Sequence, residues 1–143
     1  MTEPYKLKFD IDGENFTGAG EASSKTKAAL KQLGIPADVV RRVIICMYEG
    51  EINMVIHADG GVAEVEVDES GVVIRLKDRG PGIPDLDAAQ REGFSTATSE
   101  IRELGFGAGM GLPNMRRYAD EFGLESTVGV GTTVTMKILL PKV

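Results

Sequence analysis

The sequence predicts an α+β fold, a two-layer sandwich in which a mixed, mainly antiparallel sheet carries helices on one face. Two observations predict it. Segments with the alternating pattern of half-buried strands occur as hairpin-like pairs, and segments with helical spacing of apolar residues are grouped apart from them. A chain of 143 residues is long enough for one domain with a sizeable core, so we interpret residues 1–143 as a single domain.

The first half of the chain predicts a strand and two helices. Residues 5–11 alternate apolar and polar side chains, as an opening or edge strand does. Residues 23–33 are rich in Ala, Lys and Leu, and Gly34 is a stop signal after this first helix. Pro36 suits the first turn of a second helix, which is expected to reach about His57 and to be mostly buried.

The second half predicts two hairpins around a loop region and a helix. Residues 62–68 and 72–77 alternate as a hairpin, and the glycines and prolines of residues 78–84 exclude regular structure. Residues 94–111 form a candidate mobile lid. A third long helix is expected from Leu112 through Phe122, with Gly123 at its end, before a hairpin of residues 124–128 and 132–140.

The composition narrows the class of protein. With 42% hydrophobic and 27% charged residues, the chain has the usual mixture of a soluble globular protein. A net charge of −6 disfavours binding to nucleic acid or to anionic membrane surfaces. No apolar run approaches the roughly 18 residues of a membrane helix, and no signal peptide is recognisable, so a cytoplasmic location is expected. The single cysteine, Cys46, is interpreted as a buried structural thiol.

Polar side chains interrupt the apolar second helix at regular intervals. Glu49, Asn53 and His57 are spaced four residues apart and therefore project from nearly one face. Such a stripe is either a solvated helix face or a site, and its spacing alone does not decide between them. The loops that follow favour a site.

Two glycine-rich segments could bind a nucleotide. Asp78 ends a strand and is followed by Gly80 and Gly82, so that a carboxylate stands beside backbone that a ligand can approach. A tight turn with a capping Asp is the alternative. Further on, four glycines lead directly into a helix, whose exposed N–H groups and dipole suit phosphates, with a flexible loop as the alternative: Gly105, Gly107, Gly109 and Gly111.

These motifs, in this order and followed by the segment GVGTT at 129–133, resemble the nucleotide-binding boxes of the gyrase, heat-shock chaperone, histidine kinase and MutL (GHKL) superfamily. The match spans roughly residues 40 to 140. The segments GFST at 93–96 and GLPNMRRYADEF at 111–122 are similar to small bacterial switch serine/threonine kinases and anti-sigma factors, which act on STAS-domain partners.

The resemblance implies a histidine-kinase-like ATPase fold that binds ATP and Mg²⁺. Asn53 would coordinate Mg²⁺, and Glu49 would act as general base toward a serine or threonine hydroxyl. Asp78 would bind adenine with help from Thr132. Gly80 and Gly82 would let the nucleotide approach the backbone beside Asp78. The later glycines would wrap the phosphates: Gly105, Gly107, Gly109 and Gly111. His57 is interpreted as structural.

The function that the resemblance implies is an ATP-dependent serine/threonine protein kinase of a bacterial partner-switching system, phosphorylating a STAS-domain antagonist. One alternative is an anti-sigma factor or nucleotide-gated binding module with little catalysis, which would bind a sigma factor. Another is an ATPase subunit in which Glu49 activates water. The sequence does not identify the partner, and it is compatible with either a monomer or a homodimer.

Overall fold

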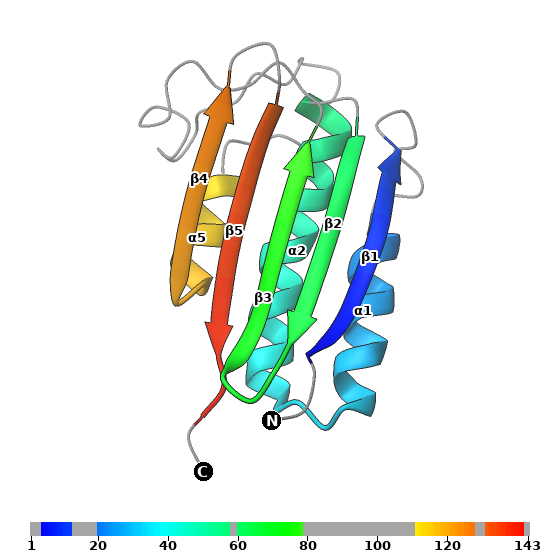
Figure 1. Cartoon of the computed structure of the whole chain (residues 1–143), viewed down its shortest axis with the longest axis vertical. Helices are drawn as coiled ribbons and strands as arrows, with labels where there is room; N and C mark the ends of the chain where they lie inside the picture. The colour runs from blue at the N-terminus through cyan, green and yellow to red at the C-terminus, as the bar shows by residue number, and fades with distance from the viewer. Residues whose placement is uncertain (1–3, 13–19, 58–59, 79–110, 128–130, 142–143) are drawn as a thin grey trace.

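The computed structural model describes residues 4–12, 20–57, 60–78, 111–127 and 131–141. Its sheet has five strands in the order β1-β2-β3-β5-β4 (Figure 1). The strands are β1 (Tyr5–Asp12), β2 (Gly60–Val67), β3 (Gly71–Asp78), β4 (Glu121–Thr127) and β5 (Gly131–Leu139). Each pairing between them is antiparallel, which confirms the mainly antiparallel sheet expected from the alternating segments.

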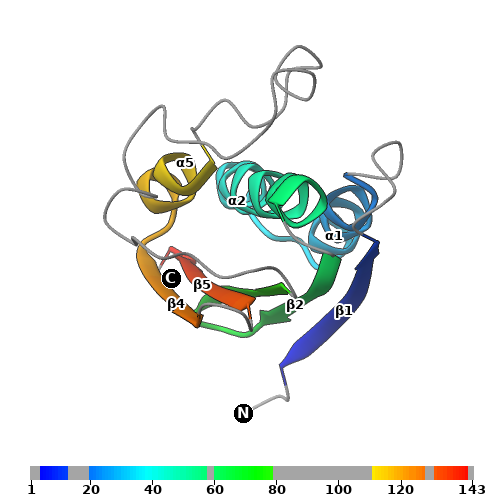
Figure 2. The same cartoon turned by 90° about the horizontal axis from the view of Figure 1, so that it is seen from above.

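The described helices lie together on one face of the sheet and form the second layer of the sandwich (Figure 2). They are α1 (Glu21–Gln32), α2 (Ala37–His57) and α5 (Gly111–Tyr118). The first two agree with the predicted helices to within about two residues at each end, the usual uncertainty of a helix boundary. No helix in the described ranges combines the length and the apolar character needed to cross a membrane.

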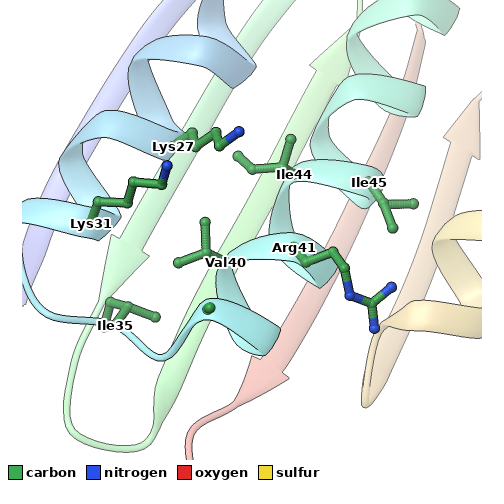
Figure 3. A pocket seen from close by; sticks show the side chains of 8 residues that line it. Lys27, Lys31, Ile35, Val40, Arg41, Ile44 and Ile45 are labelled. Atoms are coloured by element: carbon green, nitrogen blue, oxygen red, sulfur yellow. The ribbon is translucent and has the colours of Figure 1, made fainter.

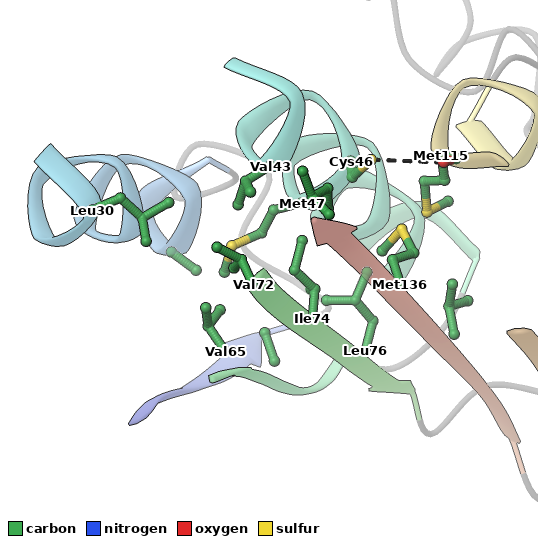
Figure 4. Packing of buried hydrophobic residues seen from close by; sticks show 14 of the residues in the cluster. Leu30, Val43, Cys46, Met47, Val65, Val72, Ile74, Leu76, Met115 and Met136 are labelled. Atoms are coloured by element: carbon green, nitrogen blue, oxygen red, sulfur yellow. Dashed lines mark hydrogen bonds between the residues drawn. The ribbon is translucent and has the colours of Figure 1, made fainter. Parts of the chain in front are cut away.

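The core lies between α2 and the central strands (Figure 4). Strands β2, β3 and β5 bury alternate residues, among them Val65, Ile74 and Met136, each with no exposed surface. On the other face of the sheet the intervening residues form ion pairs between strands, from Lys77 to Glu64 at 2.7 Å and from Arg75 to Glu66 at 3.3 Å. The alternation in the sequence therefore separates an apolar inner face from a charged outer face.

Gly50 allows α2 to lie directly on β3. A Cβ atom built at this position would overlap the side chain of Leu76, which is 98% buried on the inner face of β3. The close approach brings the part of α2 that carries Glu49 down onto the strand that ends at Asp78.

The third long helix was predicted to extend too far. Helix α5 ends at Tyr118, and Phe122 and Gly123 belong to strand β4, where they pair with Met136 and Thr135. The backbone N–H of Asp120 already bonds the carbonyl of Lys137 at 2.8 Å, so the chain has joined the sheet by then. Phe122 satisfies both the helical spacing from Tyr118 and the strand alternation with Leu124, which explains the error.

Asp120 secures this helix-to-strand junction. Its carboxylate accepts a hydrogen bond from the Leu139 N–H at 2.7 Å and pairs with Arg42 at 3.0 Å. Arg42 in turn donates to the carbonyl of Tyr118 at the end of α5. The Leu139 N–H, followed by Arg42, holds the pKa of the Asp120 carboxyl below its usual value.

We expect Asp120→Asn to lower the free energy of unfolding by about 1 kcal/mol at pH 7, because the carboxylate is partly exposed and screened. Since the folded-state pKa is lowered, this contribution is present above the unfolded-state pKa and is lost as the pH falls through the folded-state pKa. Urea unfolding between pH 3 and pH 7 measures the difference. Glu121→Gln, at the exposed neighbouring position, is the control, and a difference independent of pH would contradict the assignment.

Candidate functional site

Glu49 lies on the side of α2 that faces α5. It is half-buried, and its Oε1 accepts a hydrogen bond from the Nδ2 of Asn114 at 3.3 Å. The same two helices are joined by Cys46, whose Sγ lies 3.7 Å from the carbonyl oxygen of Met115. Packing against α5 therefore orients Glu49. The first turn of α5, which supplies Asn114, begins at Gly111, the last glycine of the predicted phosphate-binding segment.

Several predicted site residues cannot be placed by their side chains. Helix α2 is continuous through Asn53 and His57, but these two side chains lie outside the description. Residues 79–84 of the predicted loop (78–84) and residues 94–110 of the predicted lid (94–111) are also outside the described residues. They contain the glycines Gly80, Gly82, Gly105, Gly107 and Gly109.

Asp78 and Thr132, far apart in the sequence, meet at the ends of β3 and β5. The backbone N–H of Thr132 donates to the Oδ1 of Asp78 at 2.9 Å. The Thr132 hydroxyl is buried and lies 2.9 Å from the Oγ of Ser126 on β4. A chain of polar groups therefore runs from Asp78 across β5 to β4.

Glycines on both neighbouring strands pack closely against the backbone at Asp78. Gly61 of β2 pairs with Asp78, and a Cβ atom on either Gly61 or Gly131 would collide with main-chain atoms of residues 77 and 78. Gly131 has a φ of 149°, which side chains rarely allow. These glycines therefore allow the chain at Gly61 and Gly131 to lie against the backbone of β3 at Asp78.

Sequence reasoning missed a buried carboxylate on α2, Glu51, which is 3% exposed. It points away from Glu49 toward the start of α1 and accepts four hydrogen bonds. Their donors are Gly20 N at 2.8 Å, Ala22 N at 3.2 Å, and Ser23 N and Oγ at 3.1 and 2.8 Å. Gly20, the residue that precedes α1, has no side chain to cap the helix, so Glu51 caps it from another helix.

Cys46 has the structural role expected from the sequence. It has no exposed surface, and burial raises the pKa of its thiol to about 12. The reactive thiolate is therefore scarce near neutral pH.

Two of the predicted site residues, Glu49 and Asp78, lie toward one end of the molecule. The carboxyl-terminal half of α2 and the tip of β3 lie at the same end (Figure 1). Glu49 is oriented by Asn114, and Asp78 is linked to Thr132 and Ser126. Glu49 and Asp78 therefore occupy the two positions, on the helix that covers the sheet and at the end of a central strand, that the sequence resemblance assigned to the base and to the adenine acceptor. The chain belongs to the family of histidine kinase-, DNA gyrase B- and HSP90-like ATPases, whose model matches residues 38–142.

Relatives within this family confirm the narrower resemblance. The chain is 34% identical to the serine/threonine-protein kinase RsbT of Bacillus subtilis over 98 residues, 68% of this chain but 62% of that protein. It is 31% identical to the anti-sigma F factor of Geobacillus stearothermophilus over 143 aligned positions, covering 96% of this chain and 92% of the relative.

A solved structure shows the same fold. The structure of the RsbU and RsbW domains of Rv1364c from Mycobacterium tuberculosis superposes with a TM-score of 0.66 at 16% sequence identity. The superposition covers 96% of this chain and 33% of the other.

Asn114 and Ser126 were not singled out from the sequence. Asn114 could have been found as the polar residue in the first turn after the glycine-rich segment. Ser126 had no such signal, because only the register of β4 against β5 places it opposite Thr132.

Proposed function

We propose that the chain is an ATP-dependent serine/threonine protein kinase of a bacterial partner-switching system and that it phosphorylates a STAS-domain protein. The observation that supports this most is Glu49, a half-buried carboxylate oriented by Asn114 on the helix that also carries Asn53. The family is one of ATPases, and the relatives named above are a serine/threonine-protein kinase and an anti-sigma factor.

The residues present suit Mg-ATP. Asp78 offers a carboxylate at the end of β3, which fits recognition of the exocyclic amine of adenine, and Thr132 and Ser126 add hydroxyl groups. Within the described ranges, no group of three or more His, Cys, Asp or Glu side chains is arranged so that it could hold a metal ion. Mg²⁺ would therefore rely on Asn53 and the nucleotide's phosphates, an oxygen ligand set that it prefers. Bound Mg²⁺ neutralises charge that develops on the phosphates.

The role proposed for Glu49 is that of general base. The substrate hydroxyl oxygen forms a bond to the γ-phosphorus while the bond from that phosphorus to the bridging oxygen breaks, releasing ADP, and the hydroxyl proton passes to the Glu49 carboxylate. Asn114 would keep that carboxylate in place. The glycines from Gly105 to Gly111 would contact the phosphates through their N–H groups.

A second function is favoured by one specific finding. A relative that the chain matches over 92% of that protein's length is named an anti-sigma F factor. The chain would then bind a sigma factor in a manner that depends on its nucleotide, with or without phosphoryl transfer.

Incubation with Mg-[γ-³²P]ATP and a panel of purified STAS domains tests the proposal. We expect label on a serine or threonine of one partner, and none when that residue is replaced by alanine. Release of free phosphate without any partner would instead support the ATPase interpretation. Nucleotide-dependent capture of a sigma factor without any labelled protein would support the anti-sigma alternative.

A further inference from the structure

A hollow of about 450 Å³ lies between α1 and α2, away from the candidate nucleotide site. It adjoins the amino-terminal half of α2 and extends across the outer surface of that helix from α1 toward α5, because Arg41, which lines it, lies 5.9 Å from the centroid of the Tyr118 ring. Figure 3 shows Lys27 and Lys31 reaching from α1 toward α2.

The base of the hollow is aliphatic. It is lined by Val40, which is 4% exposed, and by the half-buried side chains of Ile35, Ile44 and Ile45. Tyr48 is 42% exposed and continues the outer surface of α2 one turn beyond Ile44. An apolar surface of this kind can bury the aliphatic side chains of a ligand.

The rim is cationic although the chain as a whole is acidic. Lys27 and Lys31 are exposed, and in the described part of the chain neither has a carboxylate within ion-pair distance. Arg41 also lines the hollow but pairs with Asp38 at 3.0 Å, the carboxylate on the same turn of α2. Two unpaired ammonium groups therefore stand beside an aliphatic surface in a chain of net charge −6.

We propose that this hollow is a docking site for a segment of a partner protein that carries Asp or Glu beside aliphatic side chains. The carboxylates would pair with Lys27 and Lys31, and the aliphatic groups would cover Val40 and Ile44. Charge complementarity selects such a segment. Nucleic acid offers no aliphatic side chains to cover Val40 and Ile44, so the aliphatic base of the hollow favours a protein segment.

A library of random 12-residue peptides displayed on phage, selected on the intact chain without nucleotide, tests the proposal. We expect enrichment of peptides that combine at least two acidic residues with aliphatic ones. A synthetic peptide of the enriched sequence should bind at least about tenfold more weakly to the double variant Lys27→Glu, Lys31→Glu. Lys6→Glu with Lys8→Glu, on exposed positions of β1, makes the same change of charge and should leave affinity unchanged.

Amide chemical-shift mapping locates the bound peptide. Shifts should concentrate in residues 27–45. Enriched peptides without acidic residues, equal weakening by both double variants, or shifts centred elsewhere would overturn the proposal. A chain that binds no peptide and forms a dimer would also overturn the proposal if replacement of Lys27 and Lys31 dissociated that dimer. The hollow would then be occupied by a second copy of the chain.

Discussion

We expect Glu49→Gln to reduce phosphoryl transfer to the protein substrate by roughly 10²- to 10⁴-fold, the range that a general base contributes. Glutamine retains an oxygen that can accept the hydrogen bond from Asn114, so the local structure should persist. It cannot accept the substrate proton. Single-turnover transfer measured at saturating Mg-ATP isolates this step from nucleotide binding.

The matched control for Glu49→Gln is Glu121→Gln, which makes the same chemical change at an exposed position of β4. It should leave transfer unchanged. The affinity for ATP should change little in either variant. A transfer rate in Glu49→Gln within about threefold of the wild-type rate would show that Glu49 is not the general base.

Glu51→Ala should have the largest effect on stability, lowering the free energy of unfolding by about 3 kcal/mol. The replacement leaves the N–H groups of Gly20, Ala22 and Ser23 without their acceptor in a mostly buried place. It also removes the negative charge from the positive end of the α1 dipole. Urea unfolding followed by circular dichroism measures the loss.

Two further variants distinguish the loss of the Glu51 cap on α1 from the effect that any substitution has on stability. Glu51→Gln keeps one acceptor oxygen and should retain part of the lost stability, whereas Glu125→Ala on the exposed face of β4 should change it by less than about 0.5 kcal/mol. Hydrogen exchange in Glu51→Ala should accelerate first at Ala22 and Ser23. A stability loss as small as that of Glu125→Ala would show that water can replace the Glu51 carboxylate.

Local pattern was sufficient to predict most of the fold. The strands β2 and β3 alternate strictly because one face is buried and the other carries ion pairs, and α1 and α2 are bounded by Gly34 and Pro36. Within the described ranges, the prediction of helices and strands was wrong where two periods coincide. Phe122 suits a helix after Tyr118 as well as a strand before Leu124, and its pairing with Met136 decided between them.

The candidate site was predictable to the extent that it follows from motifs. Glu49 and Asp78 were singled out from residue type and position, and the structure brings Asp78 to Thr132 across 54 residues of sequence. Glu51 could not be found in this way. A lone glutamate within a helix carries no local sign that the start of another helix will pack against it, since that contact depends on the tertiary fold.

The central claim is that ATP binds with its adenine at Asp78. Calorimetric titration of the intact chain with Mg-ATP, compared between the wild type and Asp78→Asn, tests it most directly. We expect saturable binding at one site in the wild type and at least about tenfold weaker binding in the variant, which offers an amide in place of a charged acceptor. No binding heat with the wild type, or equal affinity in both proteins, would contradict it.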